Sequence, residues 1–351
     1  DLDVIENIAN IFEKEGADCW FTDDPQKFLG KKYKKEDYIK SNDIVEVWFD
    51  SGATHSYVLE KRKDLTWPAS MYLEGSDQHR GWFHSSLLES CGTRGRAPFK
   101  SILTHGFVVD GKGLKMSKST GNIIAPEEIL KKYGADILRA WVAASDYSED
   151  LRLDYSILEQ QAESYRKVRN TFRFLLGNLR DKKVNFNLNS KEINKWPELE
   201  RFILHQIFSL NKNFEKYFKE YNFHKLYKEL LNFCSLDLSA FYFDIRKDTL
   251  YCDEIKSPKR QICINLLGLI LDMLLKWFAP ILSFTTEEIF QILNQGTDTS
   301  IHLEKFPEIP KKWENKKIFE KWEKLKIVRN VTNAAIEIKR SSKDIGSSLE
   351  A

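Results

Sequence analysis

Cysteine is scarce in this sequence and nowhere paired. The five cysteines lie far apart, at Cys19, Cys91, Cys234, Cys252 and Cys263, and no Cys-x-x-Cys pair occurs. This spacing argues against a zinc site made by these residues, so we expect no metal ligands in the chain. Scattered single cysteines are typical of reduced thiols, which predicts a cytoplasmic protein.

A strong charge imbalance and long apolar runs are missing too. The 54 basic and 52 acidic residues leave a net charge of only +2. Binding to a polyanion would therefore depend on a local basic patch rather than on overall charge. We find no apolar run long enough to predict a membrane span and no secretory signal, so we expect no membrane partner.

The pattern of apolar residues changes near residue 150. Before it, apolar runs bounded by turn residues predict strands at 44–49, 70–75 and 99–109. Residues 76–90 predict a helix with Ser76 as its N-cap. The predicted apolar face of this helix consists of Trp82, Phe83, Leu87 and Leu88. Strands that alternate with helices predict a parallel α/β sheet.

Beyond residue 150 the strand signals give way to helical periodicity. We predict helices at 157–179, 198–218, 224–247, 259–278, 285–293 and 318–340. Prolines separate several of these segments, and together they predict a helical bundle. The polar stretch 181–195, rich in asparagine and lysine, predicts an exposed loop.

A basic loop follows the last predicted strand. Residues 111–121 read GKGLKMSKSTG, with three lysines between flanking glycines. Lysines on a mobile loop can bind a polyphosphate and neutralise the charge of a departing pyrophosphate. The spacing is not that of a Walker loop. Most lysine-rich loops are solvated turns, and composition alone leaves that alternative open.

A second candidate lies where the strand predicted at 70–75 ends. In YLEGSDQHRGWF (72–83), Glu74, Asp77 and Gln78 fall at the end of a strand and the start of a helix. Ligands bind at this edge of open α/β sheets, and acidic side chains there suit hydroxyl or ammonium groups. Helix capping by Ser76 and Asp77 is the structural alternative.

Two tryptophans and a histidine are further candidates. Trp48, in EVWFDSGATH (46–55), would form one wall of an apolar pocket, with Trp82 facing it. Core packing is the commoner role for any single tryptophan. In LTHGFVV (103–109), the glycine after His105 permits a ligand to approach the backbone closely, although a lone histidine in such a run is more often a core residue.

Four strings occur together in the order and at the separations of one family. VWFDSG, YLEGSDQHRGWF, LTHGFVVDGKGLKMSKSTGN and YGADILRAWVAASDY resemble the isoleucyl-tRNA synthetases, which are class I aminoacyl-tRNA synthetases. Lys-Met-Ser-Lys-Ser at 115–119, between His-Gly-Phe and Gly-Asn, is specific to class I. The resemblance covers nearly the whole chain and favours the bacterial type of the isoleucine enzyme.

The resemblance implies an α/β part followed by an all-α part. Residues 1–150 would be the second half of a Rossmann-like catalytic domain, 151–340 a helical-bundle anticodon-binding domain, and 341–351 the start of a C-terminal segment. The family's His-Ile-Gly-His half, editing domain and C-terminal zinc segment are not in this sequence. We therefore expect a piece of a longer enzyme, inactive alone, with zinc only in the missing segment.

The implied activity is the activation of isoleucine with ATP and Mg²⁺ to isoleucyl-adenylate, and its transfer to tRNA(Ile), by a monomer. Two alternatives remain. The first is a class I synthetase for valine or leucine. The second is a tRNA-binding module without enzymatic activity, which would have no use for the loop at 115–119 or for the residues at 74–79.

Residue roles follow from the resemblance. The implied catalytic residues are Lys115, Ser117 and Lys118. The implied contacts of ATP and the adenylate are Glu74, Gly75, Asp77, His105, Phe107, Val108, Met116 and Ser119. Those of isoleucine are Trp48, Gln78 and Trp82. The candidates for tRNA binding are basic residues of two predicted helices: Arg166, Lys167, Arg169, Arg173, Lys324, Lys326 and Arg329.

Overall fold

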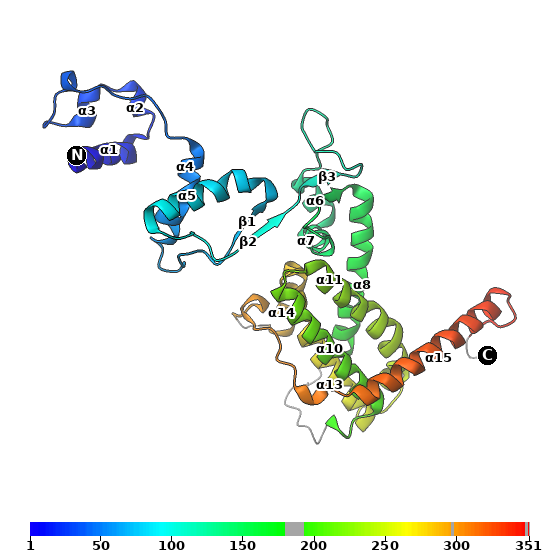
Figure 1. The fold of residues 1–351 in the computed structure, drawn as a ribbon. Helices are drawn as coiled ribbons and strands as arrows, with labels where there is room; N and C mark the ends of the chain where they lie inside the picture. The colour runs from blue at the N-terminus through cyan, green and yellow to red at the C-terminus, as the bar shows by residue number, and fades with distance from the viewer. Residues whose placement is uncertain (180–192, 296–297, 348–349, 351) are drawn as a thin grey trace. The chain divides into compact units, whose positions relative to one another are not determined.

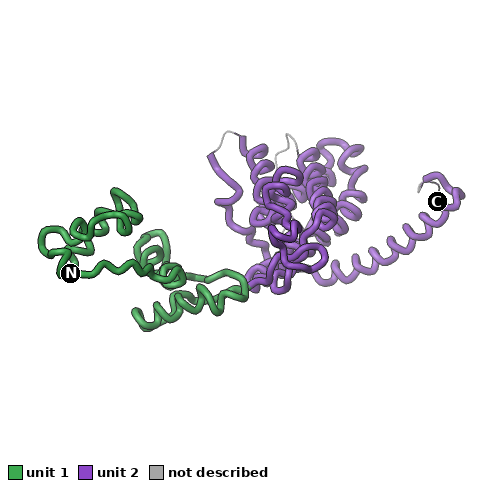
Figure 2. The backbone as a smooth tube through the Cα atoms, turned by 90° about the horizontal axis from the view of Figure 1, so that it is seen from above, with its two compact units in different colours: residues 1–104 green, residues 105–351 purple. Residues whose placement is uncertain are grey.

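The computed structural model describes residues 1–179, 193–295, 298–347 and 350. The chain divides into two compact units, residues 1–104 and residues 105–351, which Figure 2 shows in two colours. Most of the loop predicted at 181–195 lies outside the described residues. All five cysteines are free thiols, as their spacing predicts.

The first unit begins with short helices held together by aromatic side chains. They are α1 (Leu2–Glu15), α2 (Cys19–Thr22), α3 (Pro25–Leu29) and the 3-10 turn η1 (Lys35–Asp37). Phe28 is buried, and its ring centroid lies 6.3 Å from that of Phe12 and 4.9 Å from that of Trp20. Aromatic packing therefore takes the place of a larger apolar core in this segment.

The segment predicted as a strand at 44–49 turns into a helix, so that prediction is wrong. α4 (Val47–Gly52) begins where the Glu46 carboxylate accepts the backbone N–H of Trp48, and the π-helical turn η2 (His55–Leu59) follows. The cap satisfies an amide that the start of a helix would otherwise leave unpaired. The apolar side chains of this segment are exposed: Ile44, Val45, Val47, Trp48 and Phe49.

A strand–helix–strand unit follows (Figure 1), which confirms the predicted alternation. It consists of β1 (Tyr72–Gly75), the 3-10 turn η3 (Ser76–Arg80), α5 (Trp82–Arg94) and β2 (Ile102–His105). β1 pairs with β2, and the adjoining bridge between Ala69 and Phe99 is parallel. The sheet is thus small and parallel.

The helix predicted at 76–90 differs from the observed one at its start and on its inward face. Ser76 makes no capping hydrogen bond, so the predicted N-cap is wrong. Phe83 is buried as predicted, whereas Leu87 and Leu88 are exposed. The other buried side chains of α5 are Ser86 and Ser90. Their hydroxyls form hydrogen bonds with neighbouring groups, so small polar residues occupy the face that the leucines were predicted to fill.

The second unit starts with another small parallel sheet. β3 (Val108–Asp110) pairs with β4 (Leu151–Leu153), with Val109 opposite Arg152. α6 (Pro126–Tyr133) and α7 (Ala135–Ala144) lie between the two strands in sequence. The strand predicted at 99–109 is therefore divided, because β2 ends at residue 105 and β3 begins at residue 108.

The helical bundle confirms the predicted helices. It consists of α8 (Tyr155–Leu179), α10 (Glu198–Lys219), α11 (Phe223–Asn232), the π-helical η4 (Phe233–Phe243), α12 (Asp244–Tyr251), α13 (Pro258–Phe278), α14 (Ser283–Leu293) and α15 (Lys316–Ser341). Two 3-10 turns, η5 (Ile301–Leu303) and η6 (Lys311–Trp313), precede α15. The segment predicted as one helix at 224–247 is continuous but has a π-helical centre.

α13 is the most apolar element of the bundle core. Contrary to the prediction from sequence, it is long and apolar enough to cross a membrane by length and composition alone, the only such helix among the described residues. Within the bundle, 72% of its most apolar window is buried. This burial is what the central helix of a packed core requires, since an all-round apolar surface needs neighbours on every side.

α7 fixes the start of the second unit to the bundle. The buried Asp136 carboxylate accepts the backbone N–H of Phe284 at 3.2 Å and that of Thr285 at 2.7 Å. Arg139 donates to the carbonyls of Pro280 and Ile281 at 2.7 and 3.0 Å. Charge-assisted hydrogen bonds of this kind are about twice as strong as neutral ones. The sheet and its loop are therefore mounted on the bundle.

Candidate functional site

The basic loop begins with a tight turn after β3. Asp110 Oδ1 accepts the backbone N–H groups of Lys112 and Leu114 at 2.9 and 2.8 Å. Asp110 Oδ2 accepts a hydrogen bond from Asn122 Nδ2 at 2.9 Å, so the carboxylate joins both ends of the loop. The hydrogen bond from Asn122, reinforced by the one from Leu114, lowers the pKa of Asp110 below its usual value. The carboxylate therefore stays charged at neutral pH.

The middle of the loop is folded on its own hydroxyl groups. Ser117 Oγ lies 2.6 Å from Thr120 Oγ1 and 3.1 Å from Ser119 Oγ. The backbone N–H of Ser117 donates to Asn122 Oδ1 at 3.0 Å. Gly121, with φ at +66°, closes the turn in a conformation that glycine adopts without strain. The loop therefore has a definite shape rather than being a random solvated turn.

The two lysines of the 115–119 string have no partner in the part of the chain that the structure describes. Lys115 and Lys118 are exposed, and within the described part of the chain neither ammonium has a hydrogen bond or an ion pair. Met116 packs against a small apolar cluster that includes Ile129 and Trp141. The loop is thus anchored by Met116 while its two positive charges face outward. That arrangement can bind a polyphosphate and stabilise negative charge that develops on it.

Residues 105–108 lead into this loop along the chain. His105 Nδ1 donates to the carbonyl of Gly106 at 2.8 Å, and the backbone N–H of Phe107 donates to Asp150 Oδ1 at 2.8 Å. The side chains of Phe107 and Val108 are exposed. An exposed apolar pair on an ordered backbone suits a flat ligand such as an aromatic base.

In the first unit, two acidic side chains lie at the end of β1 and in the turn that follows it. Glu74 and Asp77 are exposed, whereas Gly75 is buried. Gln78 is half-buried, and its Oε1 accepts the backbone N–H of Trp82 at 3.0 Å, while its Nε2 lies 3.4 Å from Asp77 Oδ2. The two carboxylates thus remain available to hydroxyl or ammonium groups, and Gln78 links Asp77 to the start of α5.

Aromatic packing fixes Trp82. Its ring stacks on that of Tyr72, with centroids 4.2 Å apart and planes 6° from parallel, and its Nε1 donates to the Ser51 carbonyl of α4 at 2.9 Å. Trp48 lies beside it, because a Cβ on Gly81 would fall 3.2 Å from Trp48 Cη2. Trp48 and Trp82 therefore border the same α4–α5 contact.

Sequence reasoning missed the role of Tyr72. This buried residue supports Trp82 from behind, and its hydroxyl lies 3.1 Å from Ser86 Oγ. It lies in the segment predicted as a strand at 70–75, but nothing in the sequence indicated which ring it would contact. The role of Gly81 was missed as well. It lies between the side chains of Gln78 and Trp48, but in the sequence it looks like a glycine in any turn.

The predicted tRNA-binding residues differ in how free their charges are. Arg169 and Arg173 on α8 are exposed and have no partner among the described residues, whereas Arg166 pairs with a glutamate one turn away. Lys326 pairs with an aspartate at 2.8 Å, and so does Arg329. Lys167 and Lys324 are exposed. Arg169 and Arg173 therefore offer more available charge than the paired residues of α15.

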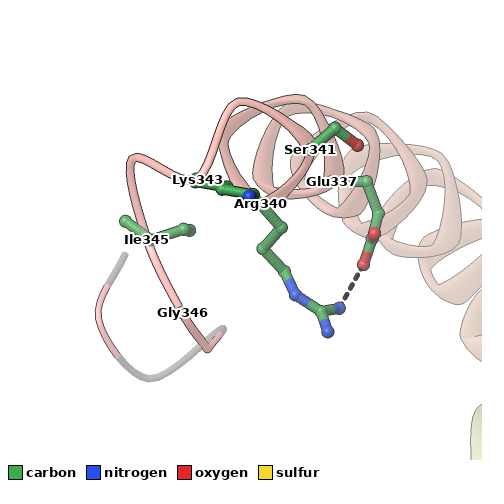
Figure 3. A pocket seen from close by; sticks show the side chains of 6 residues that line it. All are labelled: Glu337, Arg340, Ser341, Lys343, Ile345 and Gly346. Atoms are coloured by element: carbon green, nitrogen blue, oxygen red, sulfur yellow. Dashed lines mark hydrogen bonds and ion pairs between the residues drawn. The ribbon is translucent and has the colours of Figure 1, made fainter.

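A shallow pocket lies at the end of α15 (Figure 3). It is lined by Glu337, Arg340, Ser341, Lys343, Ile345 and Gly346. Arg340 pairs with Glu337 inside it, so its charge is already neutralised. In the described residues, no three His, Cys, Asp or Glu side chains gather closely enough to hold a metal ion. The lysines and tryptophans described above are therefore the stronger site candidates.

Two family models match the sequence. Residues 1–154 match the tRNA synthetases of class I (I, L, M and V), and residues 200–351 match the anticodon-binding domain of tRNA ligase. The isoleucine–tRNA ligase of Pelagibacter ubique is 68% identical over 351 residues, 100% of this chain and 39% of that protein. The one from Mesorhizobium japonicum is 48% identical, over 99% of this chain and 34% of that protein. The chain thus spans little more than a third of the length of these relatives.

Solved structures share the fold. The LeuRS of Agrobacterium radiobacter, in a ternary complex with tRNA and LeuAMS, matches 79% of this chain and 34% of its own with a TM-score of 0.64 and 17% identity. The methionyl-tRNA synthetase of Mycobacterium tuberculosis, in complex with methionyl-adenylate, matches 73% of this chain and 51% of its own with a TM-score of 0.56 and 16% identity. At such identities these likenesses show the fold alone.

The order of elements agrees with these matches. The small parallel sheets and their helices fall within the first match, and most of the bundle falls within the second. The fold class and the family predicted from the four strings are both confirmed. The chain belongs to the class I tRNA synthetases, of which it carries part of the catalytic domain followed by the anticodon-binding domain.

Proposed function

We propose that this chain is part of an isoleucine–tRNA ligase, which activates isoleucine with ATP and transfers it to tRNA(Ile). The observation that carries the proposal is 68% identity, along the whole chain, to a protein of that name. In the first step the isoleucine carboxylate attacks the α-phosphate of ATP, isoleucyl-adenylate forms and pyrophosphate leaves. ATP enters this step as its Mg²⁺ complex.

The loop residues act on the phosphates in this proposal. Lys115 and Lys118 hold the departing pyrophosphate, whose charge grows in the transition state. Their lack of partners among the described residues supports this role, since an ammonium already paired with a carboxylate would have to break that pair first. Ser117 and Ser119 shape the loop, as their hydrogen bond to each other at 3.1 Å supports. Met116 anchors the loop through its contact with the apolar cluster and lies next to Lys115 on the phosphate side of the adenylate.

The residues after β1 hold the rest of the adenylate. The exposed carboxylates of Glu74 and Asp77 suit the ribose hydroxyls, and buried Gly75 lets the ligand approach the backbone. Gln78 helps to hold the ammonium group of isoleucine. Trp48 and Trp82 form walls of its side-chain pocket, which their shared contact with α4 and α5 supports. His105, Phe107 and Val108 line the adenine side.

The helical domain carries the tRNA contact. We propose that Arg169 and Arg173 of α8 contribute most, because their charges are exposed and unpaired within the described residues. The protein acts in the cytoplasm as a monomer, and its free thiols support that compartment. Phosphate contacts imply that tRNA affinity falls steeply with salt. Replacing both arginines by alanine should reduce that salt dependence, whereas replacing the paired Arg329 should change it little.

Pyrophosphate exchange by the full-length protein tests the proposal. Isoleucine should support the fastest exchange, with valine next and with leucine and methionine far behind. Valine is expected to compete because it lacks one methylene, whose burial is worth only about 0.8 kcal/mol. Exchange that is faster with leucine or valine than with isoleucine would contradict the proposed amino acid. Absence of exchange with all four would contradict the enzymatic function itself.

A further inference from the structure

We propose that Asn122 is a positioning residue of the reaction. It holds the loop 115–119 in its working shape by joining that loop to Asp110. This inference rests on the proposed function and extends it to two residues outside the Lys-Met-Ser-Lys-Ser string. Neither side chain needs to touch a substrate, because both act through the loop. We call the pair of Asp110 and Asn122 the clasp.

The amide of Asn122 uses its whole hydrogen-bonding capacity within the loop. Nδ2 donates to Asp110 Oδ2 at 2.9 Å and to the Lys115 carbonyl at 3.2 Å. Oδ1 accepts from the Ser117 backbone N–H at 3.0 Å and from Thr120 Oγ1 at 2.7 Å. An amide has two donor hydrogens and two acceptor lone pairs, and all four are satisfied here. No other side chain of this size offers the same combination.

Asp110 gives the clasp a fixed support. It is the last residue of β3, whose pairing with β4 places it in the small sheet. Its Oδ1 is occupied by the two backbone N–H groups of the turn at 112–114, which leaves Oδ2 to face Asn122. The carboxylate thus joins the sheet, the turn and the far end of the loop. A loop held at both ends keeps its lysines within a narrow range of positions.

The clasp satisfies the polar groups around the two lysines of the motif and leaves their ammonium groups outside this network. The hydroxyls of Ser117 and Thr120, and the backbone groups that Asn122 contacts, are satisfied inside the loop. The ammonium groups of Lys115 and Lys118 have no such partner in the described residues. A preorganised loop needs no ordering when ATP binds, so more of its interaction with phosphate reaches the transition state.

Replacing Asn122 by aspartate removes both donors but keeps size and shape. In Asn122→Asp, one carboxylate oxygen faces the charged Asp110, and the other can still accept from the Ser117 backbone N–H. The exchanged pair, Asp110→Asn with Asn122→Asp, restores an amide and a carboxylate across the same 2.9 Å contact. Only the bond to the Lys115 carbonyl stays broken. The exchange therefore isolates the clasp from the other contacts.

The test uses the full-length protein in pyrophosphate exchange. Asn122→Asp should lower turnover and raise the KM for ATP, together by about tenfold or more, because at least two hydrogen bonds are lost. The KM for isoleucine should not change. The exchanged pair should recover most of the loss. Thermal unfolding of each variant shows whether the protein stays folded, since a merely structural defect would lower stability without a selective change in the KM for ATP.

A second readout needs no activity. Trypsin cleaves after exposed lysines, and release of the loop should speed cleavage after Lys115 and Lys118 several-fold in Asn122→Asp. Cleavage after Lys61, an exposed lysine in the first unit, serves as the internal control. The exchanged pair should return the loop cleavage towards its original rate.

Two results would overturn the clasp. The first is Asn122→Asp with unchanged cleavage of the loop. The second is an exchanged pair as impaired as the single variant in both readouts. If the unaltered protein shows no exchange with any amino acid, the proposed function fails, and the cleavage rates alone still decide whether the clasp holds the loop.

Discussion

Two regions of the molecule position their functional side chains by different physical means. In the first unit, Trp82 is fixed by stacking on Tyr72 and by a hydrogen bond to a helix carbonyl, and Trp48 packs on Gly81. In the second unit, hydrogen bonds between small polar side chains shape the loop at 115–119.

The difference matches what each region is proposed to recognise, which is isoleucine in the first unit and the phosphates of ATP in the second. Packed rings form stiff walls, which discriminate by size because interiors deform little. Hydrogen bonds preorganise the loop, and its two outward lysines, which have no partner among the described residues, can meet an incoming phosphate without further ordering. Changes in the packed region should therefore alter the choice of amino acid, and changes in the loop should alter the rate with ATP.

The largest expected effect is that of Lys118→Ala. Loss of one charge contact to the departing pyrophosphate should slow exchange by about 10²–10³-fold in the full-length protein. Lys112→Ala is the matched control, because this lysine lies on the same turn but outside the 115–119 string. If Lys118→Ala raises the KM for isoleucine and leaves the maximal rate unchanged, the proposed contact of Lys118 with pyrophosphate is wrong.

A smaller effect is expected when the support behind Trp82 is removed. Tyr72→Leu removes a stacked ring and should raise the KM for isoleucine about three- to tenfold, since an aromatic pair contributes about 0.5–1.5 kcal/mol. Tyr72→Phe keeps the ring and loses only the contact with Ser86, so it should stay close to the original value. Equal effects of the two variants would show that the hydroxyl, and not the stack, matters.

Gly81→Ala should perturb the same wall more gently. The new Cβ would fall 2.5 Å from Gln78 Oε1 and 3.2 Å from Trp48 Cη2, so both side chains must shift. We expect a rise of several-fold in the KM for isoleucine and little change in the KM for ATP. Gly92→Ala is the control within α5, the helix that Gly81 precedes, because its Cβ would meet nothing within 4 Å. If Gly81→Ala and Gly92→Ala change the KM for isoleucine equally, Gly81 is not part of the pocket wall.

The sequence predicted much of this organisation, and its failures have physical causes. Long periodic segments such as 198–218 were predicted well because one apolar face repeats over several turns. The short run at 44–49 was misjudged, since its five apolar and aromatic residues fit a strand or a helix equally, and the cap formed by Glu46 decided between them. Short runs carry too few periods to separate the two.

The site shows the same division. The family strings located the lysines and the tryptophans, because those residues recur at fixed spacing. They did not reveal the stack of Tyr72 on Trp82 or the bond between Asp110 and Asn122, which join residues ten or more positions apart. Such contacts depend on how strands and turns bring side chains together, and no local pattern encodes them.

The smallest expected effect concerns the helical bundle, which carries neither Trp48 and Trp82 nor the loop at 115–119. His205 Nδ1 accepts the backbone N–H of Asn315 at 2.9 Å, and burial lowers the pKa of His205 below its usual value. Folding thus favours the neutral form of His205. This preference contributes fully to the stability of the protein above about pH 6.5, the pKa of histidine in unfolded chains. The contribution is lost as the pH falls below that value.

Acidification from pH 7.5 to 5.5 should therefore lower the free energy of unfolding by up to about 1 kcal/mol, since the unfolded chain binds the proton over about one pH unit below 6.5. Thermal unfolding should show this as a drop in Tm of about 2–4 °C. His205→Gln, which cannot be protonated, should flatten the dependence. If the Tm of His205→Gln falls with pH as steeply as that of the original protein, another titrating group causes the pH dependence.

The central claim is that packing positions the amino-acid pocket and hydrogen bonding positions the loop. The most direct measurement compares Tyr72→Leu and Asn122→Asp in pyrophosphate exchange by the full-length protein, with ATP and isoleucine varied in turn. We predict different outcomes for the two variants. Tyr72→Leu raises the KM for isoleucine alone, whereas Asn122→Asp raises the KM for ATP and lowers turnover. If both variants raise both KM values to the same extent, the two regions are not positioned independently and the account is wrong.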